Sequence, residues 1–501
     1  MKQTNLLILL TVLVSMFSTK ALAYDIAVEN EDGKKIYYNY ITDGTELSVT
    51  YRTNSYNSYS GDIKIPETVT ILNKTRKVTS IGTGAFKDCS GLTSINIPGS
   101  VTSIGTEAFS YCRGLTSINI PGSVTSIGAG AFGNCSGLTS ITIPDGVTSI
   151  GSRAFEYCSG LTSVTIPASV TSIGDHAFYK CSGLKKVIVK DIAAWCGISF
   201  NGVDSNPLGG YAKLYSDEDT EITNLVIPDG VTSISSYAFE LCSGLTSVTI
   251  PASVTSIGGW AFDYCSGLKK VIVKDIAAWC GISFGYGNSN PLYYAEHLYS
   301  DEDTEITNLI IPDGVTSIGS DAFYGCSGLT SVTIPGSVTS IGDRAFYNCS
   351  GLTSVTIPDG VTSIGWYAFY GCSGLTSVTI PASVTSIGLY AFDKCNNLAD
   401  FVSLIQEPFA VGNIVSDFIY KNGTLYVPQG TMAKYKATNG WKQFLWMEEG
   451  VPTSIKPANG NDNNATEVQR YTIGGESVNH PQHGINIVKM SDGTAKKVMV
   501  K

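Results

Sequence analysis

Residues 161–183 read Leu161-Thr-Ser-Val-Thr-Ile-Pro-Ala-Ser-Val-Thr-Ser-Ile-Gly-Asp-His-Ala-Phe-Tyr-Lys-Cys-Ser-Gly183. Close copies of these 23 residues recur along the chain, and this recurrence determines the fold. A fixed period of this length is the sequence signature of a solenoid. Leu161, Val164 and Ile166 alternate with Thr and Ser, as in a half-buried strand, and Pro167 ends that strand. The repeat therefore begins with a strand and a corner.

The second half of the repeat predicts a short strand followed by a helical turn. Val170 and Ile173 lie in the strand, and Gly174 ends it. Ala177 and Phe178 lie four and three residues before Cys181, which is the spacing of side chains on one helical turn. A single coil of this kind cannot bury enough apolar surface alone, so stability must come from stacking, and both ends need a cap.

The cysteines mark the repeat. Eleven of the 13 occupy one repeat position: Cys89, Cys112, Cys135, Cys158, Cys181, Cys242, Cys265, Cys326, Cys349, Cys372 and Cys395. No CxxC pair or column of His accompanies them, so small, inert core residues are favoured over redox chemistry or metal binding. Parallel Cβ directions in a ladder also suit a disulfide poorly.

The period breaks twice, at inserts of about residues 190–222 and 274–306 that repeat each other 84 residues apart. Asp191 and Asp275 each predict the N-cap of a short helix. Trp195 and Trp279 are expected to pack the inserts onto the solenoid, with a ligand platform as the alternative. The acidic tips near Asp217 and Asp301 are interpreted as solvated turns, with a calcium site as the alternative.

The remaining segments predict the domain organisation. Residues 1–23 combine Lys2, an apolar run and a small-residue cleavage site, as in a secretory signal peptide. We then expect an N-terminal cap (24–62), the solenoid (63–398), a C-terminal cap (399–450), a linker rich in Asn, Gly and Pro (451–466) and a small β module (467–501). No later segment is apolar for long enough to predict a transmembrane helix.

Composition excludes several function classes. The 501 residues include 53 Gly, 43% hydrophobic and 15% charged residues, and the net charge is −10. A hydrophobic fraction of this size argues against disorder, and the negative charge disfavours a nucleic-acid binder. The four His residues have no nucleophile or acid column around them, and no phosphate loop or HExxH motif is present. We therefore predict no enzyme activity, no metal and no cofactor.

The repeated unit Leu161-x-x-Val-x-Ile-Pro … Ile173-Gly-x-x-Ala-Phe-x-x-Cys181 resembles the BspA-type leucine-rich repeat, and the inserts resemble long repeats of the same family. The resemblance implies a mainly β fold with short helical turns: a right-handed, single-stack leucine-rich-repeat solenoid of 23-residue coils with two 38-residue inserts. Ser169 or a Gly stands where common leucine-rich repeats have an Asn ladder. The C-terminal module resembles short sorting modules of anaerobic Gram-negative bacteria, some of them read by type IX secretion.

The family resemblance implies an exported surface or secreted protein that binds host matrix proteins or other bacteria without catalysis. We expect a monomeric, adhesin-like scaffold of a Gram-negative bacterium, at the cell surface or outside the cell. Its partner would be an extracellular protein or glycan of the host or of neighbouring bacteria. The alternatives are a glycan-binding module and a passive surface-layer spacer.

The candidate ligand site comes from the positions that vary between repeats, namely the two residues before Ala-Phe and the two after it. Aromatic residues accumulate there: Tyr111, Tyr157, Tyr179, Tyr237, Trp260, Tyr264, Tyr324, Tyr347, Trp366, Tyr367, Tyr370 and Tyr390. Tyr and Trp supply large contact areas with little rotamer entropy to lose, so we predict that they line one binding face. The alternative is that surface positions vary freely and Tyr only covers the edge of the core.

Overall fold

The computed structural model describes residues 23–54, 56–210 and 212–450, together with the strand segments 467–472, 477–478, 484–490 and 495–500. The predicted linker 451–466 and the predicted signal peptide, apart from Ala23, lie outside the described residues. The chain forms two compact units, Met1–Leu268 and Lys269–Lys501.

The first unit begins with a β-rich cap. Strands β1 (Ile26–Glu29), β2 (Lys35–Ile41) and β3 (Glu46–Thr50) are antiparallel, and the 3-10 turn η2 (Thr42–Gly44) joins β2 to β3. The hairpin of β5 (Thr68–Ile71) and β6 (Lys74–Ile81) joins this sheet because β6 pairs with β3 in parallel. Strand β4 (Gly61–Lys64) pairs with β7 (Leu92–Asn96). The cap thus converts an antiparallel sheet into the parallel ladder of the coils.

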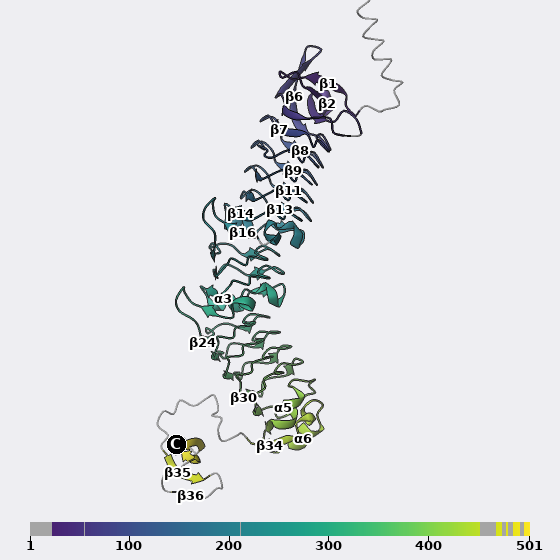
Figure 1. Cartoon of the computed structure of the whole chain (residues 1–501). Coiled ribbons are helices and arrows are strands. Elements are labelled where there is room, and N and C mark those ends of the chain that lie inside the picture. Colours follow the sequence, from purple (N-terminus) through teal and green to yellow (C-terminus); the bar gives the residue numbers. More distant parts are fainter. Residues whose placement is uncertain are drawn as a thin grey trace, which may run out of the picture. The chain divides into compact units, whose positions relative to one another are not determined.

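Two rows of parallel strands run through the coils of the first unit. The first strands of the coils are β10 (Ser140–Thr142), β12 (Ser163–Ile166), β14 (Lys186–Val189), β16 (Lys213–Tyr215), β17 (Asn224–Val226) and β19 (Ser247–Ile250). The second strands are β8 (Ser103–Ile104), β9 (Ser126–Ile127), β11 (Ser149–Ile150), β13 (Ser172–Ile173), β15 (Ser199–Phe200), β18 (Ser233–Ile234) and β20 (Ser256–Ile257). The register pairs equivalent residues, as in Ser103↔Ser126, and Figure 1 shows β8, β9, β11 and β13 stacked in order.

The predicted helical turn takes the form of consecutive reverse turns. Glu107 and Tyr111 have φ values of 53° and 62°, the left-handed conformation that a type II turn requires at its third position. A third ladder joins the coils here, because the amide of Phe109 donates to the carbonyl of Ala131 at 2.7 Å. The side chains at the variable positions are therefore carried by a stacked backbone rather than by helices.

The core consists of columns of equivalent residues. Phe86, Phe109 and Phe132 are fully buried, and successive rings lie 5.0 and 5.2 Å apart. All 13 cysteines are free and buried, and the thiol of Cys135 donates to the carbonyl of Phe109 at 3.0 Å. Ser169 takes the place of the missing Asn ladder, because its hydroxyl donates to the carbonyl of Val147 at 2.7 Å.

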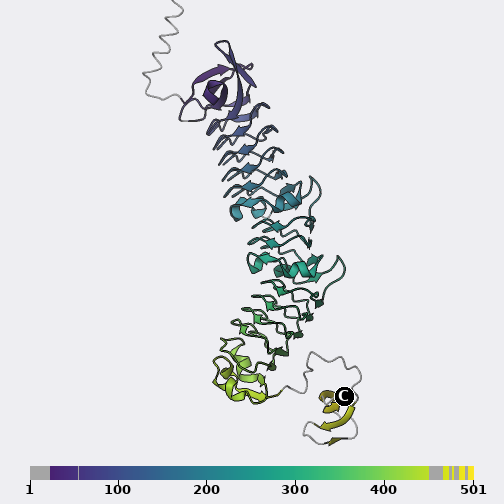
Figure 2. The same cartoon turned by 180° about the vertical axis from the view of Figure 1, so that it is seen from behind.

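In each insert, a side chain bonds to a backbone carbonyl that a backbone amide bonds in the regular coils. The first contains α2 (Ile192–Cys196), η3 (Val203–Ser205) and η4 (Pro207–Gly210), and Asp191 caps α2 by accepting from the amide of Ala194. The indole of Trp195 is buried and donates to the carbonyl of Ala238 at 2.8 Å, which confirms the packing interpretation. Figure 2 shows the loop of this insert projecting from the coils of the first unit.

The second unit repeats the same construction. Its first strands are β21 (Lys270–Val273), β23 (Leu298–Tyr299), β24 (Asn308–Ile310), β26 (Ser331–Thr333), β28 (Ser354–Thr356), β30 (Ser377–Ile380) and β32 (Asp400–Ser403). Its second strands are β22 (Ser283–Phe284), β25 (Ser317–Ile318), β27 (Ser340–Ile341), β29 (Ser363–Ile364) and β31 (Ser386–Ile387). The second insert contains α3 (Ile276–Cys280), η5 (Gly287–Ser289) and α4 (Leu292–Ala295), and Trp279 donates to the carbonyl of Ala322 at 2.8 Å.

A C-terminal cap closes the core of the second unit. It comprises α5 (Asp417–Asn422), β33 (Thr424–Val427), α6 (Met432–Ala437), η6 (Trp441–Gln443) and β34 (Trp446–Glu449). The column of Phe rings ends when Phe392 meets Phe401 edge-on, and Trp441 and Phe444 cover Phe401. Farther along, β35 (Glu467–Thr472), β36 (Ser477–Val478), β37 (Gly484–Met490) and β38 (Ala495–Val500) form an antiparallel sheet.

Candidate functional site

Six tyrosines of the second unit make a continuous series of ring contacts, which we call the tyrosine ladder. Its members are Tyr293, Tyr324, Tyr347, Tyr370, Tyr367 and Tyr390. Centroids of successive stacked rings are 5.3, 4.6 and 4.7 Å apart from Tyr293 to Tyr370. Tyr367 meets Tyr370 edge-on and stacks on Tyr390 at 5.2 Å, so two columns join into one.

The position of each tyrosine within its repeat explains why the rings of the ladder stack. Tyr324, Tyr347 and Tyr370 are the residues directly after Ala-Phe in three consecutive coils, and the one-to-one register of the strands superimposes equivalent positions. Tyr367 and Tyr390 are the residues directly before Ala-Phe, and both have positive φ. The stacking distance is thus set by the spacing between coils.

Stacking determines which part of each ring is available to a partner. The planes of Tyr324 and Tyr347 differ by 11°, and those of Tyr347 and Tyr370 by 9°. Tyr324 and Tyr347 therefore have a stacked ring on both faces, which leaves their edges and hydroxyl groups for contact. Burial, followed by the neighbouring Tyr370, raises the pKa of Tyr347, so this phenol is neutral at physiological pH.

An ion pair supports the start of the ladder. Arg344 donates from Nε to Oδ1 of Asp321 at 2.7 Å and from a terminal nitrogen to Oδ2 at 3.2 Å. Asp321 is only 2% exposed, and the hydrogen bond to it raises the pKa of Arg344. Bidentate pairs of this kind fix geometry as well as charge. The pair lies in the same column as Tyr367 and fixes the backbone on which Tyr324 and Tyr347 are carried.

The predicted residues of the first unit form smaller groups. Tyr157 and Tyr179 meet edge-on at 5.9 Å, with Lys180 over both rings. Tyr237 stacks on Trp260 at 5.3 Å. Tyr111 lies under the guanidinium of Arg113, and Tyr264 is exposed. The 12 predicted residues therefore divide into several groups, and the largest is the ladder.

Trp366 lies apart from the ladder. It lines a shallow groove together with the Ser and Ile residues of β27, β29 and β31 and the Gly that follows each of these strands, and no ladder tyrosine lines this groove. Trp366 and Tyr367 are adjacent in sequence, yet only Tyr367 has positive φ and joins the tyrosine contacts. Trp366 therefore lines the groove, whereas Tyr367 and Tyr370 belong to the tyrosine ladder.

Sequence reasoning missed Tyr293, because it belongs to the second insert and not to the repeat. The first insert has Gly209 at the matching position, so a comparison of the two inserts was the available signal. Gly325 lies against the backbone that carries this ring: a Cβ there would lie 3.3 Å from the carbonyl oxygen of Leu292 and 3.4 Å from the Cα of Tyr293. The insert thereby extends the ladder by one ring.

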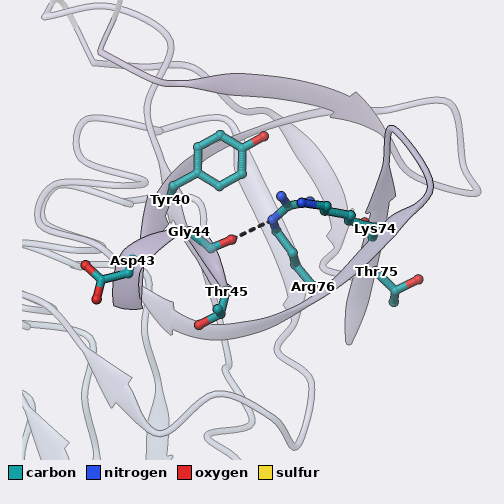
Figure 3. A pocket seen from close by; sticks show the side chains of 7 residues that line it. All are labelled: Tyr40, Asp43, Gly44, Thr45, Lys74, Thr75 and Arg76. Carbon is teal, nitrogen blue, oxygen red and sulfur yellow. Dashed lines mark hydrogen bonds between the residues drawn. The ribbon is translucent and has the colours of Figure 1, made fainter.

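Sequence reasoning also missed a shallow pocket of about 630 Å³ in the N-terminal cap (Figure 3). Tyr40, Asp43, Lys74 and Arg76 line it. Arg76 donates from Nε to the carbonyl of Gly44 at 2.7 Å, and its guanidinium lies 5.0 Å from the centre of the Tyr40 ring. These contacts tie Arg76 to the cap, so we interpret the pocket as part of the hairpin packing.

The thiols and acidic tips have structural environments. Burial raises the pKa of the Cys89 thiol to about 11 and that of Cys196 to about 12, whereas a nucleophilic thiol needs a lowered pKa. Asp217 accepts from the amides of Asp219 and Thr220 at 2.9 and 2.8 Å, which closes the first tip as a turn. Within the described part of the chain, no three His, Cys, Asp or Glu side chains form a group suited to a metal ion.

Stacked parallel strands, columns of stacked Phe rings and a one-to-one register between successive coils define a leucine-rich-repeat solenoid. The family model for the BspA type leucine rich repeat region matches six copies, at residues 56–185, 213–284 and 297–407. The chain belongs to this family.

Solved structures and curated proteins complete the comparison. A leucine-rich repeat protein from Bacteroides ovatus is 29% identical, with 76% of this chain and 94% of that one covered and a TM-score of 0.41. A leucine rich cell surface protein from Faecalibacterium prausnitzii is 28% identical, with 85% and 96% covered and a TM-score of 0.36. No curated protein matches the sequence. None of the helices in the described ranges has the length and apolar character needed to cross a membrane.

Proposed function

We propose that this protein is an exported, non-catalytic scaffold at the cell surface or in the extracellular space that binds a host matrix protein or a protein of another cell. The tyrosine ladder is the observation that carries the proposal. Aromatic side chains with few rotatable bonds are enriched among the residues that dominate protein interfaces.

The coil architecture does not require tyrosine at the ladder positions. The equivalent position directly after Ala-Phe holds Ser110, Gly133 and Glu156 in three coils of the first unit, and those coils have the same strand register. Three consecutive tyrosines at this position, extended by Tyr293 from an insert, are therefore an addition to the basic coil. Their stacking can stabilise the coils, and their exposed edges can also contact a partner.

The ladder suits a protein partner better than a sugar that stacks on ring faces. The rings of Tyr324 and Tyr347 are covered on both sides, so a pyranose cannot lie on them. Ring edges carry partial positive charge, and phenolic hydroxyl groups donate hydrogen bonds. Carbonyl and carboxylate oxygens on a protein surface match such a row.

Export forms the second part of the proposal. Residues 1–23 would direct secretion, and the C-terminal sheet of β35 to β38 would act as a sorting module. Deletion of residues 451–501 should then change the cell fraction in which the protein is found, as measured by immunoblot of fractionated cells. An unchanged distribution would contradict a sorting role.

Binding is tested with immobilised fibronectin, fibrinogen, laminin and collagen by biolayer interferometry on the full mature chain. We expect at least one of them to bind and the double variant Tyr347→Ser/Tyr370→Ser to bind about 30-fold more weakly, equal to roughly 2 kcal/mol. The matched control is Thr333→Ser/Thr356→Ser, on the exposed strand positions of β26 and β28, and should bind as the wild type does. No binding by the wild type would favour a passive spacer, and a loss confined to the control would place binding on the strands.

A further inference from the structure

A second surface of the second unit has the chemistry of a saccharide site. Its groove has a volume of about 380 Å³ and crosses successive coils. Each coil contributes the same Ser-Ile-Gly segment, so hydroxyl groups recur in register at Ser340, Ser363 and Ser386. Asp343 and Trp366 complete the polar and aromatic lining.

Trp366 is a large apolar side chain in a solvent-exposed position. It is 59% exposed, whereas the same repeat position in the two preceding coils holds Ser320 and Asp343. The indole lies against Gly388 of the next coil, where a Cβ would come within 2.4 Å of the indole Cδ1. The absence of a side chain at Gly388 thus provides the space that Trp366 occupies.

Asp343 connects the tryptophan to the groove. Its Oδ1 atom accepts a hydrogen bond from the backbone amide of Trp366 at 2.7 Å. The carboxylate is therefore fixed beside the base of the tryptophan side chain, and it is exposed to solvent. An indole, a carboxylate and a row of hydroxyl groups lie within one groove.

This combination matches the two kinds of surface on a neutral hexose. The C–H face of a pyranose packs on an aromatic ring, and its hydroxyl groups exchange hydrogen bonds with Ser and Asp side chains. No Lys or Arg lines the groove, and its one charged group is acidic, which disfavours anionic sugars. Repetition of the hydroxyl groups from coil to coil suits a polymer of similar units.

We propose that this groove binds a neutral hexose chain, with Trp366 as the stacking platform. The site is separate from the tyrosine ladder, because no ladder residue lines it. The inference goes beyond the proposed protein-binding function and does not depend on it. Matrix-protein binding and saccharide binding can each fail alone.

The test is isothermal titration calorimetry of the full mature chain with cellohexaose, mannohexaose and maltohexaose, and with hexagalacturonate as the anionic comparison. We expect one or more neutral hexasaccharides to bind and hexagalacturonate to bind at least tenfold more weakly. Trp366→Ala should weaken binding at least tenfold. The matched control is Trp446→Ala, since Trp446 is 61% exposed but lies in the C-terminal cap.

Three outcomes would overturn the proposal. These are no binding by any of the three neutral hexasaccharides, equal binding by Trp366→Ala and wild type, and the same loss in Trp446→Ala. Circular dichroism melting curves of both variants establish that the fold is retained, and Trp366→Phe, which keeps an aromatic ring, should recover part of the affinity. Unchanged matrix-protein binding by Trp366→Ala would show that the two sites are independent.

Discussion

The rings of Tyr324 and Tyr347 lie 4.6 Å apart and within 11° of parallel, although 23 positions separate them in the sequence. Their contact follows from the coil register, which places equivalent residues directly above each other. The same relationship joins Tyr347 to Tyr370. A tyrosine repeated at one position therefore becomes a continuous surface feature.

Stacking within the ladder should contribute to stability. Tyr347→Ala removes contacts with two rings and leaves a gap, and should lower the free energy of unfolding by about 2–4 kcal/mol. Tyr347→Phe keeps both ring contacts and should change it by less than about 0.5 kcal/mol. Urea unfolding followed by circular dichroism measures both. Equal destabilisation by the two variants would assign the effect to the hydroxyl group instead.

Substitution of two glycines by Ala should change stability differently, because a neighbouring coil approaches only one of them closely. A Cβ at Gly160 would lie 2.3 Å from the carbonyl oxygen of Ser136, whereas one at Gly122 would meet no atom within 4 Å. Gly160→Ala should therefore cost about 1–3 kcal/mol or more, and Gly122→Ala should be neutral or stabilise slightly. Thermal unfolding of both variants gives the comparison. Similar melting temperatures would show that neighbouring coils can separate freely at this site.

Glu240 predicts a pH dependence of stability. It is 7% exposed, and its Oε2 atom has no hydrogen-bond partner among the residues that the structure describes. Burial, followed by repulsion from Asp263 and Asp204, raises its pKa from the ordinary value of 4.5 to about 7. The unfolded chain thus loses this proton at lower pH than the folded chain. The stability that protonated Glu240 contributes is therefore fully present below about pH 4.5 and is lost as the pH rises to about 7.

The loss should be on the order of 3 kcal/mol, and Glu240→Gln should abolish this component. Urea midpoints of wild type and variant, measured at pH 4.5, 6 and 8, test the sign. A variant whose midpoint falls with pH as steeply as that of the wild type would remove Glu240 from the explanation.

The cysteine column should remain reduced and unreactive in the folded protein. All 13 thiols are buried, and burial raises the pKa of Cys181 and Cys395 to about 12, so the thiolate fraction at neutral pH is very small. Reaction with a thiol reagent should be slow in the native state and should reach 13 groups after denaturation without reductant. A clearly lower count would indicate disulfides.

The coil could be predicted from the sequence because the apolar pattern, the positions of Pro and Gly and the spacing of the cysteines all recur with the same 23-residue unit. The turn geometry could not, since Glu107 and Tyr111 adopt positive φ that their residue types do not announce. The different contacts of Trp366 and Tyr367 were equally hard to predict, because only Tyr367 adopts positive φ. Tyr293 was out of reach of the repeat pattern because it belongs to an insert.

Hydroxyl-radical footprinting of the full mature chain, free and bound to a matrix protein, shows which tyrosines the partner covers. Oxidation of Tyr324, Tyr347 and Tyr370 should fall several-fold on binding, while that of Tyr111 and Tyr157 in the first unit should stay unchanged. Protection of the first-unit tyrosines with no change in the ladder would contradict binding at the ladder.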